Sequence, residues 1–144
     1  MSASEAVLAR ALAALLAAPR GATITRRRTD AYAFDELPAI EIQRKAGSSE
    51  AHGDRADRWR MNFEIVLLVA DSSMAETALD ALWEQADSTL HADSQLAVLG
   101  RGLRCTNTSE PEQVPIEEGV AARMVCTYEI QILTRRGDLS HAMT

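Results

Sequence analysis

Alternation of apolar and polar positions predicts two long strands. From residue 58 to residue 70, apolar side chains occupy consecutive odd positions, hence one strand face: Trp59, Met61, Phe63, Ile65, Leu67 and Val69. The even positions begin polar and end apolar, with Val66 and Leu68, which predicts a strand that starts half-exposed and ends under a covering helix. Residues 122–134 alternate in the same way, with one apolar face: Met124, Cys126, Tyr128, Ile130 and Ile132.

Apolar residues at helical spacing predict two helices. Ser2 and Glu5 form a Ser-x-x-Glu capping box at the start of the first, which we expect Pro19 and Gly21 to end. Ser73 and Glu76 form a second such box, ahead of one apolar helix face: Leu79, Leu82, Trp83, Ala86 and Leu90. We expect this face to pack on the sheet.

Shorter patterns predict strands over Ile24–Asp30, Ala39–Lys45 and Leu103–Thr108. Three segments lack an apolar period, and we predict a mobile loop over 46–57, an acidic loop over 110–118 and a frayed tail over 135–144. The order α-β-β-β-α-β-β predicts an α+β fold, in which residues 1–144 form one domain with a mostly antiparallel sheet flanked by helices.

Composition and charge narrow the function classes. The 144 residues are 47% hydrophobic and 25% charged, which is typical of a globular domain, and the net charge of −6 argues against a general nucleic-acid binder. Residues 1–60 hold ten Lys/Arg and eight Asp/Glu, a net of +2, whereas residues 61–144 hold five and thirteen, a net of −8. Unlike halves of this kind suggest head-to-tail association between copies.

The sequence predicts no catalytic, cofactor-binding or metal site. His52, His91 and His141 lie far apart in the chain, and Cys105 and Cys126 lack the Cys-x-x-Cys spacing of metal and redox motifs. We expect both cysteines to be buried free thiols in a reducing compartment. No run reaches the roughly 18 apolar residues of a membrane span, so we expect no membrane association.

The arrangement resembles the tail terminator, or tail completion, proteins of long-tailed bacteriophages and prophages. The resemblance rests on the N-terminal helix, the segment Glu36-Leu37-Pro38-Ala39-Ile40-Glu41-Ile42 entering a strand, and the polar loop before the strand Trp59–Val69. It extends to the helix Glu76–Leu90 and to the strand Val125–Leu133, which runs into Thr134-Arg135-Arg136-Gly137-Asp138-Leu139.

The resemblance implies a structural, non-enzymatic minor tail protein of the virion, made in the bacterial cytoplasm. Such proteins form a hexameric ring at the head-proximal end of the tail tube, where they stop tube growth and offer a surface to the head–neck connector proteins. DNA passes through the ring, and an acidic lumen would repel it. Two alternatives stay open: another phage neck or head-completion connector, and a small α+β enzyme.

Subunits of a ring meet through two different patches. We hypothesise that one patch draws on the basic residues Arg26, Arg28 and Arg60 and the other on the acidic residues Glu110, Glu112, Glu117 and Glu118. The alternative is that both sets are simply solvated.

Overall fold

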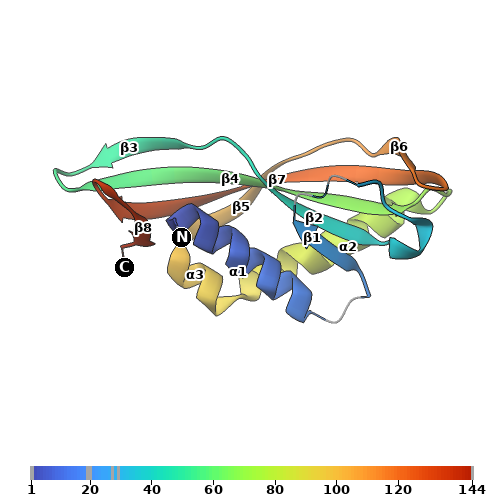
Figure 1. Cartoon of the computed structure of the whole chain (residues 1–144), viewed down its shortest axis with the longest axis horizontal. Helices are drawn as coiled ribbons and strands as arrows, with labels where there is room; N and C mark the ends of the chain where they lie inside the picture. Colours follow the sequence, from blue (N-terminus) through green and yellow to red (C-terminus); the bar gives the residue numbers. More distant parts are fainter. Residues whose placement is uncertain (1, 19–20, 27, 29, 144) are drawn as a thin grey trace.

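A pair of long antiparallel strands runs the length of the molecule. The computed structural model describes residues 2–18, 21–26, 28 and 30–143, and in it β4 (Ala56–Ala70) pairs with β7 (Gly119–Arg135). The register is continuous from Ala56 opposite Arg135 to Ala70 opposite Ala121. At about 3.4 Å per residue, the paired stretch is roughly 50 Å long, and Figure 1 shows it spanning the fold from end to end.

The other strands of the described chain attach to this pair and complete an eight-stranded, mostly antiparallel sheet. Along β4 lie β2 (Ala39–Arg44) and β3 (Ser48–His52), and β2 in turn pairs in parallel with β1 (Thr23–Arg26). Along β7 lie β5 (Arg101–Thr108), β6 (Glu112–Ile116) and β8 (Asp138–Ala142). The molecule is therefore a mixed α and β fold with the predicted sheet type.

Three helices cover one face of the sheet (Figure 1). They are α1 (Ala3–Ala17), α2 (Ala75–Ala92) and α3 (Ser94–Leu99), and a short 3-10 helix, η1 (Phe34–Glu36), precedes β2. The predicted inward faces of β4, β7 and α2 meet in one buried apolar cluster. The alternation of β4 and β7 and the helical period of α2 are thus confirmed, and these helices lie on one side of the sheet only.

A polar contact joins α2 to the sheet inside this core. The Trp83 indole N–H donates to the Tyr128 hydroxyl at 3.1 Å, and that hydroxyl donates to Asp87 Oδ1 at 2.6 Å. The Phe63 ring stacks on the Tyr128 ring at 5.5 Å between centroids. Burial raises the pKa of Tyr128 well above its ordinary range, so the phenol stays protonated and keeps donating to Asp87.

The prediction of a covering helix over the far end of β4 is wrong. Val66 and Leu68 are buried on the face opposite the helices, where they pack in a second apolar cluster with Tyr32, Ile116 and Ala121. The cover consists of the segment before β2 and the hairpin of β6. The loss of alternation at Val66 and Leu68 shows that both faces are covered there, but it does not show which segment covers each face.

The predicted loop over 46–57 is wrong at its centre, because Ser48–His52 forms β3 against β4. All five residues of β3 are exposed, so no apolar alternation marks the strand. Gly53 has φ +74°, which suits the turn that returns the chain to β4. Gly53, which indicated a loop in the sequence, therefore lies in the turn of the β3–β4 hairpin.

The acidic loop and the frayed tail are corrected in the same way. Residues 112–116 form β6 and residues 138–142 form β8, each in a hairpin with one end of β7. β8 is exposed except at its last residue and β6 is buried only at Ile116. Both strands exist because β7 extends far enough to pair with them.

Helix ends were predicted unevenly. Ser2 Oγ accepts from the Glu5 N–H at 3.1 Å, which confirms the Ser2 cap. The Ser73–Glu76 box is wrong, because α2 starts at Ala75 and its N-cap, Met74, makes no side-chain cap bond. The sequence patterns did not predict α3, whose N-cap is Asp93. Pro19, Arg27 and Thr29, which figured in the predicted elements, lie outside the described residues.

Truncating the α2 face tests this packing. Leu79 is fully buried in the main cluster, so Leu79→Ala should lower the free energy of unfolding by about 2–5 kcal/mol. Glu84→Ala, on the exposed side of the same helix, should change it by less than about 0.5 kcal/mol. Urea unfolding followed by circular dichroism measures both, and equal losses would contradict the packing.

Candidate assembly surfaces

The seven predicted interface residues do not form one surface. Arg26 and Arg28 lie in and after β1, and Arg60 lies on the sheet face away from the helices. The four glutamates are spread around β6: Glu110 before it, Glu112 in it, and Glu117 and Glu118 in the turn that follows. That they contact other subunits stays a prediction, and their intramolecular partners decide which of them are available.

Arg26 is occupied within the chain. Its two terminal nitrogens donate to the two carboxylate oxygens of Glu5 in α1, one of them at 2.8 Å. Each side chain keeps about a third of its exposure, 32% for Arg26 and 36% for Glu5. The Arg26 hydrogen bonds lower the pKa of Glu5. Arg26 therefore joins helix α1 to the edge strand β1.

Arg28 is held by more partners than Arg26. Its guanidinium donates to both carboxylate oxygens of Glu36, one at 2.7 Å, and to the backbone carbonyls of Asp30 and Ala31. It also lies over the Tyr32 ring, 4.2 Å from the centroid. Each of the three guanidinium nitrogens donates to a nearby residue, so Arg28 folds the segment before β2 onto itself.

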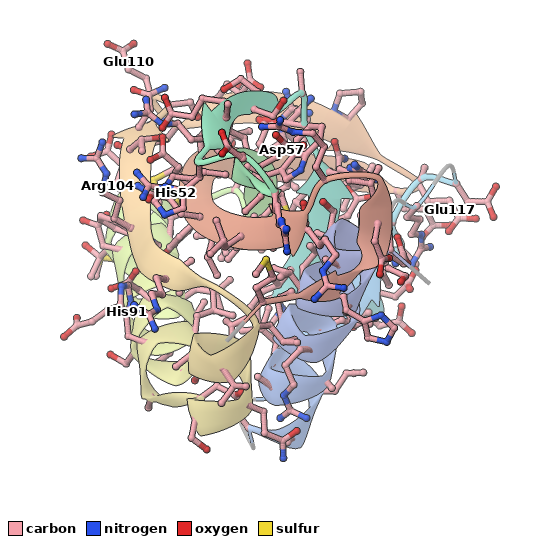
Figure 2. All side chains as sticks on the ribbon, turned by 90° about the vertical axis from the view of Figure 1, so that its left-hand side faces the viewer. His52, Asp57, His91, Arg104, Glu110 and Glu117 are labelled. Carbon is pink, nitrogen blue, oxygen red and sulfur yellow. The ribbon has the colours of Figure 1, made fainter. Side chains whose placement is uncertain are left out.

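Arg60 and three of the glutamates are available. The Arg60 side chain is exposed and has no hydrogen bond or ion pair with any described residue. The same holds for the side chains of Glu110, Glu117 and Glu118. Glu112 instead accepts from Arg123 in β7. Figure 2 shows Glu110 and Glu117 projecting away from the body on different sides, so they belong to different surfaces.

Exposed apolar side chains gather at the two ends of the long strand pair. We call one end the hairpin end, where the turn between β6 and β7 lies. It carries Phe34, Met74 and Val120, exposed by 59%, 61% and 45%. Two backbone hydrogen bonds hold this end together: the Asp71 N–H donates to the Val120 carbonyl at 3.3 Å, and the Glu117 N–H donates to the Tyr32 carbonyl at 2.9 Å.

The opposite end carries a groove, and we call it the groove end. The groove has a volume of about 460 Å³. It lies between the α3–β5 junction, the last residues of β7 and the ends of β3 and β8. Its apolar lining includes Val98, Leu133 and Met143, and its cationic lining is Arg58 and Arg101. Val98 is 65% exposed and Met143 40%.

The two groove arginines differ in how they are held. Arg58 donates to His52 Nδ1 at 3.1 Å and lies 3.7 Å from a carboxylate oxygen of Glu50 in β3. Arg101 is exposed and has no acidic partner among the described residues. The groove thus presents a lightly paired and an unpaired cation beside apolar surface.

The sequence patterns did not predict the groove, whose lining includes Gly100 and Arg101. Gly100 is where the chain leaves α3 against β7: a Cβ there would lie 2.6 Å from Ile130 Cδ1. Only a residue without a side chain lets β5 start so close to β7. The pair of glycines around an arginine was a usable signal for a close backbone approach, but nothing in it showed that Val98 and Met143 would lie nearby.

The described residues offer little for other kinds of site. They contain no cluster of three or more His, Cys, Asp or Glu side chains that could hold a metal ion. In the same part of the chain, no helix is long and apolar enough to cross a membrane. Cys105 and Cys126 are free, and burial raises the pKa of the Cys126 thiol to about 12, so this thiol is a poor nucleophile at neutral pH.

Comparison with known proteins returns no relative: no family model matches the chain, and no curated protein matches it. The two unlike ends of the long strand pair and the resemblance in sequence are therefore the features that bear on function.

The Arg28–Glu36 pair makes a prediction about acid stability. Arg28 holds the pKa of Glu36 at about 2 in the folded protein, below its ordinary 4.5. A lowered folded pKa means that the stabilisation is complete above about pH 4.5 and is lost as the pH falls towards 2. NMR titration of the Glu36 carboxyl should give a midpoint near 2, and Arg28→Gln should move it up towards 4.5. Arg60→Gln serves as the control, and an unchanged midpoint in Arg28→Gln would contradict the pairing.

Proposed function

We propose that this protein is a structural component of a bacteriophage or prophage tail. In this proposal it forms a ring, expected to be a hexamer, on the head-proximal end of the tail tube. The ring stops further addition of tube protein and provides the surface that the head–neck connector proteins bind. The proposal assigns it no chemical reaction.

The observation that carries the proposal is that the two ends of one long strand pair are unlike. The hairpin end is acidic and partly apolar, and the groove end is cationic and partly apolar. A ring of more than two subunits needs two different patches on each subunit, because every contact in it is heterologous. A chain with identical or featureless ends would lack this property.

Charge supports the passage of DNA without binding. The net charge is −6, and the unpaired glutamates around β6 add a local acidic surface. A lumen lined by such residues repels phosphates, whereas a basic lining would hold them. The proposal therefore places part of the acidic surface towards the lumen.

The order of elements also supports a tail terminator. An N-terminal helix, a strand entered from Leu37–Pro38, the long strand β4, the helix α2 packed on the sheet and the long strand β7 follow one another along the chain. The additional hairpins β3, β6 and β8 extend the sheet at its two ends, where a ring-forming subunit meets its neighbours.

The test is tube capping. Tubes assembled from the tail tube protein of the same phage should stop elongating when this protein is added, and negative-stain images should show a ring at one end of each tube. Tubes that keep growing, or protein that decorates the tube wall, would contradict the proposal. Binding to DNA-filled heads in place of tubes would identify the protein as a neck or head-completion connector instead.

A further inference from the structure

We propose that the hairpin end of one copy docks in the groove of the next copy. This contact deepens the proposed function and rests on it for its biological role. The occupant to which we commit is a second copy of this chain, because the missing charge of each surface is present on the other.

The charge and the exposed apolar surface of the groove favour an acidic and partly apolar occupant. Arg101 has no acidic partner among the described residues, and Arg58 has Glu50 only at 3.7 Å. Val98 and Met143 leave apolar surface open to water beside these cations. An occupant that carries carboxylates next to an apolar side chain satisfies both features.

The hairpin end has this composition. Glu117 and Glu118 form the exposed turn between β6 and β7, and neither carboxylate has a described partner. Val120, which is 45% exposed, lies two residues after Glu118 on the same hairpin.

The two surfaces of one molecule cannot satisfy each other. Val120 and Leu133 stand at opposite ends of β7, 13 residues apart, which is about 45 Å along a strand. The contact must form between copies, and because it joins two different patches it propagates head to tail, into a ring where the rotation between copies closes and into an open filament where it does not. Attraction between unlike ends also favours fast association at low salt.

Charge reversal on each surface provides the test. The groove variant is Arg101→Glu, and the hairpin variant is Glu117→Arg with Glu118→Arg; all three positions are exposed, so the fold is not at risk. Sedimentation velocity at low salt should show that wild-type protein associates with rising concentration. Each variant alone should associate at least about tenfold more weakly.

Mixing the two variants gives the decisive result. Arg101→Glu protein keeps an acidic hairpin end, whereas the hairpin variant keeps a cationic groove. An equimolar mixture allows two contacts between the variants. The acidic hairpin of the Arg101→Glu protein meets the cationic groove of the hairpin variant, and the two reversed surfaces, whose charges are again opposite, meet each other. The mixture should therefore associate much more strongly than either variant alone.

Glu84→Arg, a reversal on the exposed side of α2, is the matched control and should associate like wild type. A wild-type chain that stays monomeric at every concentration, variants that associate like wild type, or a mixture no stronger than its components would each overturn the contact. The two proposals fail separately: association without tube capping would overturn the proposed function alone, and capping by rings whose association ignores these reversals would overturn the contact alone.

Discussion

The uninterrupted pairing of β4 with β7 is the constraint on which the rest of the structure depends. All fifteen residues of β4 have a partner in β7, and the other strands, except the parallel edge strand β1, are bound directly to one of these two. The helices bury their apolar faces against the side that the pair presents in common. A break in the pairing would remove the strand hydrogen bonds that join β1, β2 and β3 to β5, β6 and β8.

The length of the pair also produces the two unlike ends. The helices cover one face, and β3 and β4 run past them at the groove end, whereas α2 reaches close to the hairpin end (Figure 1). The two ends of β7 are stabilised by hairpins, with β6 at one end and β8 at the other. Residues far apart in the sequence thereby meet at one end, as Arg58 and Arg101 do in the groove. The basic and acidic halves of the sequence are consequently not the two halves of the molecule.

The sequence predicted elements that are buried on one face and missed those that are exposed. β4, β7 and α2 have a strong apolar period because each packs one face into the core. β3 and β8 have almost no buried residue, so their existence follows from a partner strand and not from their own composition. α3 is only six residues long and buries one of them, Leu96, too few for a recognisable period.

The candidate interface was harder to predict for a related reason. Arg26, Arg28 and Arg60 are alike in sequence, but Arg26 finds Glu5 and Arg28 finds Glu36 once the chain folds. Only the folded arrangement distinguishes a charge that stabilises the chain from a charge left for a neighbour. The glutamates of the turn after β6 have exposed side chains, whereas Arg101 became a candidate only through its place in the groove.

Cross-linking shows whether the hairpin end of one copy lies in the groove of another. In a background in which Cys105, the half-buried native thiol, is replaced by serine, one variant carries Val98→Cys in the groove and another carries Val120→Cys beside the hairpin turn. With a flexible bismaleimide linker, the account predicts covalent dimers in the mixture of the two variants and little or none in either variant alone. Dimers formed equally well by a single variant would show that like ends meet, and would contradict the account.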